Sequence, residues 1–549
     1  MFSRDEIKNL ILAVLISAVI LILWQTPVEV EDVAVKEVVA VETQPKTVFI
    51  SREEALEKPD RIAINNAKLT GSISLKGLRF DDLLLAKYRK KIEKDSGEVE
   101  LLSPSETKSA YFAEFGWIGN TELPNKNTLW NADKSSISAN ETTTFSWINN
   151  VGVLFEIAVS LDENYMFTIT QNVANNSGKD IELFPYGLLS KNIAFDFEDS
   201  DDSRSGHKGF VGVFEGGLNE LTYEDLREDE QGSFNDKNGW FGFADKYWFT
   251  AIIPQRNSDF VAKTSYVKKD EFDKYQADFM GEKTAVTAGG SMKTVSYFYA
   301  GAKEVKAIDE YSEKLNIPLF DRSIDFGWFY FIAKPMFLVL HMIYSSVGNL
   351  GVAIILLTFG IKLLLFPIAN ASYKSMNKMK KLQPEIKKLQ ERMGKDKLKQ
   401  NTEMMKLYKK HKVNPAAGCI PLLVQIPIFF SLFKVLSISI EVRHAPFFGW
   451  IKDLSAPDPT SVFNLFTLIP WEPPQLLNIG VLPILWCISM IIQQKFNPKP
   501  ADPVQEKVMK AMPYFFLILF SSFPAGLVVY WTFSNLITIL QQYLIKRKN

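Results

Sequence analysis

The sequence has little cysteine and histidine, and it lacks the motifs of common enzyme classes. Its 549 residues include 2 cysteines, both in apolar runs, and 4 scattered histidines. Such cysteines give no disulfide framework, and such histidines give no cluster with metal-ligand spacing. No P-loop, HExxH or GxSxG motif occurs either. These absences argue against an enzyme, and they predict neither a metal site nor a cofactor.

Each half of the chain is short of charge of one sign. Residues 25–316 carry a net charge of −16 and residues 317–549 a net charge of +15, although the whole chain carries only −1. This asymmetry indicates two parts in different surroundings. The length of the chain also favours at least two domains.

The first apolar run, residues 10–24, follows Arg4 and Lys8. A cleaved signal peptide is one interpretation, but the run continues as QTPVEVEDV, without a small-x-small cleavage site. We therefore favour an uncleaved transmembrane anchor over residues 1–25. Residues 26–60 are rich in Val, Glu, Lys and Pro, and this composition predicts an extended linker.

Residues 61–316 have the pattern of an all-β domain. The segment FEIAVSLDENYMFTITQNVANNSGKD (155–180) contains two alternating runs joined at DEN, and TVSYFYAGAKEV (294–305) repeats the style. Alternation between turn clusters is typical of half-buried antiparallel strands. A domain of this size predicts a large β-sandwich. We expect residues 200–240, rich in Gly, Asp and Glu, to form surface loops.

From residue 317 the chain becomes apolar and aromatic. We interpret residues 317–348, which include FGWFYFIAKPMFLVLHMIY (326–344), as an interfacial amphipathic helix, although this segment could also begin a span. Residues 349–549 contain five further apolar runs, several of them short for a 30 Å hydrocarbon core: 349–370, 416–438, 476–494, 509–523 and 525–545. The fold class predicted is an α-helical polytopic membrane protein with six spans plus a large extracytoplasmic β domain.

The basic loops give the orientation of the spans. Residues 373–412 contain 14 Lys and Arg against 4 Asp and Glu, and the connector 495–510 and the C-terminal KRKN are also basic. The positive-inside rule places all three in the cytoplasm. Both termini are then cytoplasmic, and the acidic β domain lies on the other side of the membrane.

The basic loop 373–412 is expected to form a helical hairpin. Leu382, Ile386 and Leu389 fall on one helix face, MGKD (393–396) interrupts it, and Met405 and Tyr408 continue on a second helix. One interpretation is a solvated helix pair. The other is a docking surface for acidic partners such as lipid headgroups or rRNA.

Lys362 is the most unusual residue of the apolar runs, since it lies within TFGIKLLLFP (358–367). A lysine at the centre of a membrane costs about 2.5–3.5 kcal/mol on insertion scales, and none of the five apolar runs contains a carboxylate. In one interpretation Lys362 only holds helices together through polar neighbours. We favour a water-filled cavity, open to the cytoplasm and lined by polar residues of three runs: Thr358, Lys362, Gln425, Trp531, Ser534, Asn535, Thr538 and Gln541.

Two long motifs carry a family resemblance. NPAAGCIPLLVQIPIFFSLF (414–433) and FPAGLVVYWTFSNLITILQQYLI (523–545) closely resemble membrane signatures of the YidC/Oxa/Alb family of membrane protein insertases, and LQPEIKKLQERMG (382–394) resembles its cytoplasmic hairpin. The resemblance covers essentially the whole chain in the order of the Gram-negative form. It implies a bacterial inner-membrane protein with a periplasmic β-supersandwich and a five-span core that encloses a hydrophilic groove.

The resemblance also implies roles for particular residues. Lys362 matches a groove position where the family usually has arginine, and Thr358 matches the groove threonine. Phe429 and Phe523 match positions on an apolar slide for the substrate. Residues of the last run extend this slide: Tyr530 matches a family tyrosine, and Trp531 stands where some members have a second tyrosine.

The function implied is insertion of nascent membrane proteins into the lipid bilayer, with the ribosome and the Sec translocon as expected partners and no DNA. The C-terminal tail is short, so ribosome docking would depend more on the hairpin. Two alternatives are a structural adaptor of a translocon and a subunit of a small-solute transporter. For the β domain we favour a spacer or adaptor over a ligand site.

Overall fold

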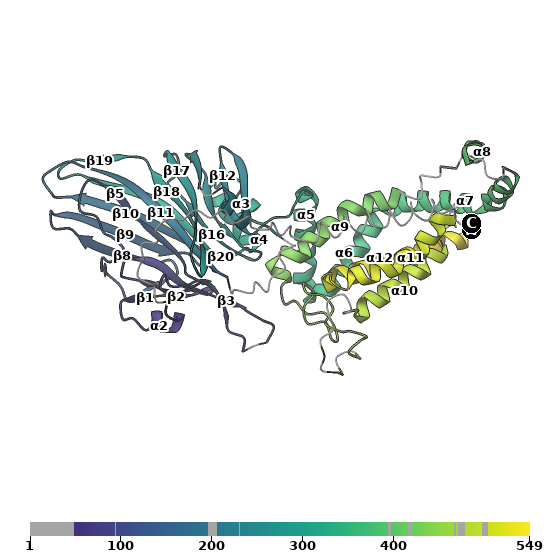
Figure 1. Ribbon diagram of the computed structural model, residues 1–549, viewed down its shortest axis with the longest axis horizontal. Helices are drawn as coiled ribbons and strands as arrows, with labels where there is room; N and C mark the ends of the chain where they lie inside the picture. The colour runs from purple at the N-terminus through teal and green to yellow at the C-terminus, as the bar shows by residue number, and fades with distance from the viewer. Residues whose placement is uncertain are drawn as a thin grey trace, which may run out of the picture.

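The computed structural model describes residues 49–548 except 94, 196–205, 230, 394–396, 412, 415–419, 466–467, 470, 472–477 and 497–502. The predicted anchor and most of the predicted linker therefore lie outside the described residues. Figure 1 shows two parts arranged end to end, a β-sandwich and a bundle of long helices.

The β-sandwich consists of two large sheets. The first has 11 strands, of which nine follow in the order β14 (Gln231–Asp236), β17 (Phe260–Lys268), β18 (Phe272–Gly281), β11 (Ile181–Ala194), β5 (Tyr111–Gly119), β3 (Arg79–Arg89), β2 (Leu69–Ser74), β1 (Arg61–Asn65) and β7 (Ser136–Ser138). Two short strands lie off this path, β19 (Thr284–Val286) beside β11 and β4 (Glu98–Leu102) beside β3.

The second sheet has 9 strands in the order β13 (Gly217–Thr222), β12 (Gly209–Phe214), β15 (Trp240–Ala244), β16 (Trp248–Ile253), β20 (Ser291–Ala302), β10 (Met166–Asn175), β9 (Val153–Leu161), β8 (Thr142–Ile148) and β6 (Asn131–Ala132). The predicted hairpin of 155–180 is confirmed, since β9 and β10 pair antiparallel with Phe155 opposite Val173. Every second residue of β9 is buried, as the alternating sequence requires.

Aromatic side chains from both sheets form the centre of the sandwich. The ring of Phe80 on β3 lies 6.0 Å from Phe115 on β5, 5.5 Å from Phe167 on β10 and 5.5 Å from Phe298 on β20. Edge-on ring contacts of this kind add to the stabilisation from apolar burial. They join the two sheets into one core without disulfides.

The expectation of surface loops at 200–240 was wrong for the described part of that segment. The described residues from 209 to 229 and from 231 to 236 include β12, β13, helix α3 (Tyr223–Glu228) and β14, and all six residues of β12 are buried. The glycines that suggested loops allow close packing instead, because a Cβ on Gly212 would lie 2.7 Å from the ring of Phe214 and 2.9 Å from the carbonyl oxygen of Trp240.

The linker predicted for 26–60 was wrong for residues 49–60, which belong to the sandwich. Ser51 caps the short helix α2 (Arg52–Leu56), Arg52 forms an ion pair with Asp82 on β3, and the ring of Phe49 packs 5.6 Å from Phe272. These contacts hold the chain against the first sheet before β1 begins.

The second part of the chain is helical. After α4 (Val305–Lys314) and the 3₁₀ turn η2 (Phe320–Ser323), the chain forms α5 (Tyr330–Val347), α6 (Leu350–Leu364), α7 (Phe366–Met393), α8 (Lys397–Lys410), α9 (Ile420–Ile438), η4 (Ile440–Val442), α10 (Val481–Phe496), α11 (Pro503–Phe520) and α12 (Ala525–Lys548). Each of the five predicted apolar runs thus contains a helix.

The run 349–370 is a broken helix rather than a straight one. The axes of α6 and α7 meet at an angle of 65°, with Leu365 between them. Pro367 explains the break, because a proline has no N–H for the helix ladder and its ring clashes with the carbonyl four residues earlier. Beyond the break, α7 continues without interruption into the first arm of the hairpin.

Among the described residues, α5 alone is long and apolar enough to cross a membrane as one helix, and α6 with α7 passes as a bent pair; residues 423–438 and 481–496 form shorter apolar helices. Helix α5 buries Ala333, Phe337 and Leu340 and exposes Phe331 and Met342. It lies between the sandwich and the other helices (Figure 1). This position fits a helix at the membrane interface as well as a span, and the interfacial role stays a prediction.

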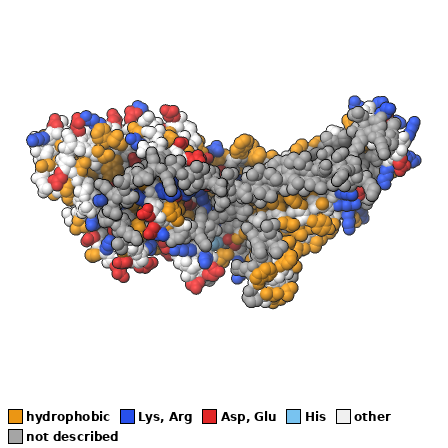
Figure 2. Space-filling view, viewed as in Figure 1, with side chains coloured by type: hydrophobic (Ala, Val, Ile, Leu, Met, Phe, Trp, Pro, Cys, Tyr) orange, Lys and Arg blue, Asp and Glu red, His pale blue; other side chains and the backbone are white. Residues whose placement is uncertain are grey.

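The hairpin has a small core of its own. Leu382 and Ile386 of α7 are buried with Val413, and Leu407 packs against them. Tyr408 packs there too, as expected, but Met405 is 49% exposed and was wrongly assigned to the inner face. Figure 1 places α8 at the end farthest from the sandwich, and Figure 2 shows Lys and Arg side chains at that end beyond a hydrophobic region.

The segment after α9 joins the helices to the sandwich. Arg443 donates hydrogen bonds to the carbonyl oxygens of Arg89 (2.8 Å) and Lys90 (3.1 Å). The hydroxyl of Tyr247 donates to the carbonyl oxygen of Ser437 at 3.4 Å. These contacts fix the end of α9 against the sandwich, and α9 is the helix that carries Gln425 and Phe429.

Candidate functional site

The ammonium group of Lys362 is held by neutral oxygens from two other helices. Its Nζ lies 3.4 Å from Oε1 of Gln425 on α9 and 3.3 Å from Oγ1 of Thr538 on α12. Neither partner is a carboxylate, so these contacts orient the cation without cancelling its charge. The structure thus brings together three residues that the sequence placed in one predicted groove.

The break at Leu365 also explains how a lysine is tolerated at this position. It places Lys362 in the last turn of α6, where the free carbonyl groups and the helix dipole favour a cation. This stabilisation was not predicted from the apolar run 349–370. Pro367 was the signal that could have revealed it.

Tyr530 lies with the polar residues around Lys362 rather than with the aromatic rings of the predicted slide. Nε2 of Gln425 donates a hydrogen bond to the hydroxyl oxygen of Tyr530, and the tyrosine is only 1% exposed. We call Lys362, Gln425, Tyr530 and Thr538 the polar set. It connects α6, α9 and α12.

The other predicted groove residues lie nearby with different partners. Thr358 is fully buried, and its hydroxyl donates to the carbonyl oxygen of Ile354 on its own helix at 2.6 Å. Ser534 is buried on α12. The carboxamide of Asn535 donates to Oγ of Ser489 on α10 at 3.0 Å, so Asn535 joins two helices instead of facing Lys362.

One contributor was missed by the sequence analysis. Tyr373 on α7 places its hydroxyl within hydrogen-bonding range of the side chains of Thr538 and Gln542. Its spacing from Lys362 could not have revealed it, because the 65° break between α6 and α7 lies between the two residues. Tyr373 adds α7 to the helices that meet around the polar set.

The remaining slide residues form one aromatic cluster. The ring of Phe429 lies edge-on to Trp531 at 5.4 Å, and Phe433 links Phe429 (6.4 Å) to Phe523 (5.8 Å). Phe520 completes the cluster at 5.3 Å from Phe523 and 5.6 Å from Trp531. The cluster is contributed by α9, by α12 and by the end of α11 with the turn that follows it, and it begins one helical turn beyond Gln425.

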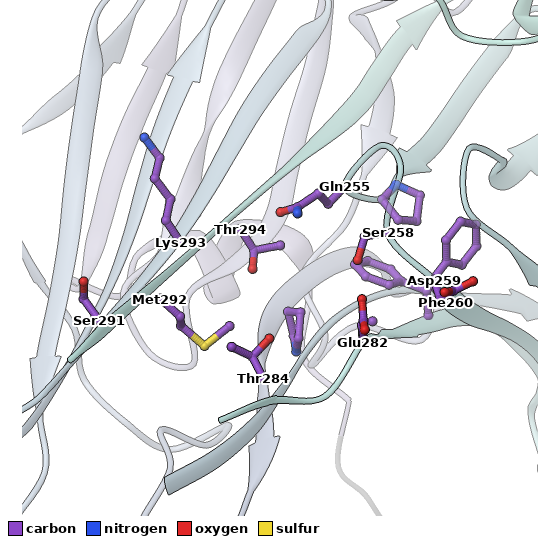
Figure 3. Close-up of a pocket in the computed structure, with 14 residues that line it drawn as sticks. Gln255, Ser258, Asp259, Phe260, Glu282, Thr284, Ser291, Met292, Lys293 and Thr294 are labelled. Atoms are coloured by element: carbon purple, nitrogen blue, oxygen red, sulfur yellow. The ribbon is translucent and has the colours of Figure 1, made fainter. Parts of the chain in front are cut away.

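The sandwich contains a hollow large enough to be compared with a ligand site. A cavity of about 270 Å³ opens among strands of both sheets, and Figure 3 shows Asp259, Glu282 and Ser258 on one side of it. Asp259 already pairs with Lys237 at 3.1 Å. Phe260 and Phe279 in its wall are almost fully buried, so they offer no ring face for stacking on a sugar or a base. These features favour the spacer interpretation of the domain.

The chain matches two protein families. Residues 61–339 match the family model described as "YidC periplasmic domain", and residues 342–549 match the one described as "60Kd inner membrane protein". Together the two matches cover both parts of the structure.

Curated relatives match over the whole length. The chain is 45% identical over 563 residues to the membrane protein insertase YidC of Rickettsia bellii, with 99% of each chain covered. It is 45% identical over 565 residues to the corresponding protein of Rickettsia rickettsii (strain Iowa), with 100% of each covered.

Solved structures give weaker likenesses. An active YidC insertase with its first transmembrane domain resolved aligns over 89% of this chain and 93% of that one, at 17% identity and a TM-score of 0.38. A putative aldose 1-epimerase of Escherichia coli K12 aligns over 44% of this chain and 99% of that one, at 11% identity and a TM-score of 0.25.

Proposed function

Because the chain belongs to the YidC family of membrane protein insertases, we propose that its polar set receives the polar flank of a nascent membrane protein during insertion. As a family member it is an insertase of the inner membrane, and the sandwich is its periplasmic domain. Family membership replaces the alternatives of a translocon adaptor and a solute transporter. We further propose that insertion involves no enzymatic step.

The observation that carries the proposal is a cation among neutral groups inside a helical bundle. The two oxygens that meet Nζ of Lys362 come from Gln425 and Thr538. A polar flank that enters a bilayer loses its hydration, at a cost of several kcal/mol per group. A hydrated groove open to the cytoplasm shortens the dry path, and the charge of Lys362 attracts acidic or polar flanks.

The aromatic cluster provides the second half of the path. Phe429, Phe523 and Trp531 present an apolar surface beside the polar set. The apolar segment of the substrate would pass along it into lipid. Burial of apolar surface at about 25 cal/mol per Å² supplies the driving force for a helix of ~20 residues.

The distribution of charge supports the orientation. Basic side chains gather at the hairpin, the sandwich lies at the opposite end, and hydrophobic side chains lie between them (Figures 1 and 2). We infer six spans with both termini in the cytoplasm, and α5 at the periplasmic interface.

The hairpin is the proposed docking surface for the ribosome. Residues 373–412 carry 14 Lys and Arg, and phosphate-rich rRNA attracts such a surface. For some substrates we expect the Sec translocon to cooperate.

Site-specific photocrosslinking tests the path. A photoreactive amino acid replaces Phe429 in the cluster or, as a matched control, the exposed Ile488 on α10. Ribosome-bound nascent chains of a short single-span protein are then presented to membranes. We expect crosslinks from position 429 only while the span emerges, and few from position 488. Equal labelling at both positions would contradict the proposed path.

A further inference from the structure

The carboxamide of Gln425 is hydrogen-bonded at both ends. Its oxygen accepts from the ammonium of Lys362 at 3.4 Å, and its nitrogen donates to the hydroxyl oxygen of Tyr530. An amide has a donor end and an acceptor end. If the group rotated by half a turn, its NH₂ would face the ammonium, and two donors would oppose each other.

We propose that Gln425 is a positioning residue that orients Lys362 through a neutral oxygen, and that Tyr530 anchors the nitrogen end of the same carboxamide to α12. This inference rests on the proposed function, because it concerns how the polar set keeps its charge available to a substrate.

The side chain of residue 425 is neutral, and this determines how much charge Lys362 presents. A carboxylate at this position would pair with the ammonium, and at 4 Å such a pair is worth several times more in a low-dielectric site than in water. The paired cation would then present little net charge. An amide oxygen fixes the direction of the ammonium and leaves its full positive charge.

The ammonium also keeps a free donor. It has three N–H groups, and Gln425 and Thr538 accept two of them. Neither contact uses the third, which is the donor that we assign to a substrate oxygen. The ligand chemistry that fits is a carboxylate or carbonyl oxygen on the translocated flank of a substrate.

The position of Tyr530 explains why a phenol is needed there. Its side chain is almost fully buried on α12, and a buried hydroxyl requires a partner. Gln425 is that partner. The pair therefore locks the amide of α9 to α12, and α12 also supplies Thr538 to the lysine.

The test uses the purified full-length protein in vesicles of phosphatidylethanolamine and phosphatidylglycerol. Three single-span probes differ only in the translocated flank, which carries two aspartates, two asparagines or two lysines. Protease protection of the flank measures insertion. The variants are Gln425→Glu and Tyr530→Phe, with Tyr514→Phe on the exposed face of α11 as the matched control for the second.

We expect Gln425→Glu to lower the acidic-to-neutral insertion ratio about tenfold, equivalent to ~1.4 kcal/mol, and to raise the lysine probe relative to the neutral one. Tyr530→Phe should lower the same ratio about threefold, because the carboxamide then loses its contact with α12 and holds its oxygen less firmly toward the lysine. Damage to the fold alone would lower all three probes together and leave their ratios unchanged.

Two results separate this inference from the proposed function. Unchanged ratios in both Gln425→Glu and Tyr530→Phe would overturn the positioning role. If Lys362→Met also left every ratio and every yield unchanged, the groove itself would be refuted. Reduced ratios in Lys362→Met with unchanged ratios in the other two variants would leave the groove intact and remove only the role of Gln425 and Tyr530.

Discussion

The carboxylate of Glu441 accepts a hydrogen bond of 3.0 Å from the backbone N–H of Val305. Val305 is the first residue of α4 in the sandwich, whereas Glu441 lies in η4, just after α9. The helical part therefore caps a helix of the sandwich, where the helix dipole favours a negative group. Glu304, the N-cap residue of α4, does not cap the helix with its side chain, which accepts hydrogen bonds from Lys68, Tyr88 and Tyr165 instead. Glu441 therefore serves as the cap.

The burial of Glu441 should make the junction sensitive to pH, since it outweighs the hydrogen bond from Val305, which lowers the pKa. Burial raises the pKa of Glu441 from 4.5 to about 7, with Glu304 adding to the rise and Lys68 opposing it. A carboxyl group with a raised pKa binds a proton in the folded state that the released state lacks. Its contribution is therefore complete below about pH 4.5 and is lost as the pH rises through about 7.

We predict that the sandwich becomes more loosely attached between about pH 5 and about pH 8. Spin labels at the exposed positions Ile148 and Phe448 would report this as a broader distance distribution in membranes. Glu441→Gln, which cannot ionise, should abolish the pH dependence. An equal broadening in this variant would assign the effect to another group.

Arg443 should stabilise the same junction because its planar guanidinium can donate to two carbonyl oxygens at once. Its guanidinium donates to two carbonyl oxygens, of Arg89 and Lys90, and lies 5.6 Å from the ring of Tyr247 and 5.4 Å from that of Trp248. Lysine keeps the charge but has no fork. We predict that Arg443→Lys increases hydrogen exchange of residues 87–91 about tenfold, with no change in β9 and β10. Unchanged exchange at 87–91 would show that the charge alone is sufficient.

The sequence predicted those elements whose residues alternate or repeat on one face. The hairpin of β9 and β10 was readable because every second residue is buried. Strand β12 was not, because GFVGVF is buried on both sides and lies between acidic segments, so its glycines resembled a loop. The ordered segment before β1 depends on contacts with Asp82 and Phe272, which lie far along the chain.

The site was predictable where a residue type was improbable in a membrane. Lys362 and Gln425 stood out for this reason. Thr538 was indicated by the polar residues of the last apolar run, which recur at helical spacing. The position of Tyr530 was not predictable in the same way, since it depends on how α12 is rotated against α9. Neighbouring residues on a helix differ in direction by about 100°, so Tyr530 faces Gln425 while Trp531 faces Phe429.

The aromatic centre of the sandwich should carry much of its stability. Phe298 is fully buried and contacts Phe80, Phe115 and Phe167. We predict that Phe298→Ala lowers the free energy of unfolding of the sandwich by about 3–5 kcal/mol, measured by denaturant unfolding of the full chain in detergent. Ile148→Ala, at a position 61% exposed, is the control and should change it by less than about 0.5 kcal/mol. A similar loss in both variants would contradict a core role for Phe298.

The charge of Lys362, rather than its shape, should determine insertion. Lys362→Arg keeps the charge, and the carbonyl groups at the end of α6 can accept its additional donors. Lys362→Met has a similar length and no charge, and it would satisfy helix packing at least as well. We predict that Arg retains insertion of an acidic-flank probe within about twofold and that Met lowers it about tenfold, as measured by protease protection of the flank in vesicles. If Met matched the unaltered protein while its thermal stability rose, Lys362 would be a packing residue, and the water-filled groove would lose its main support.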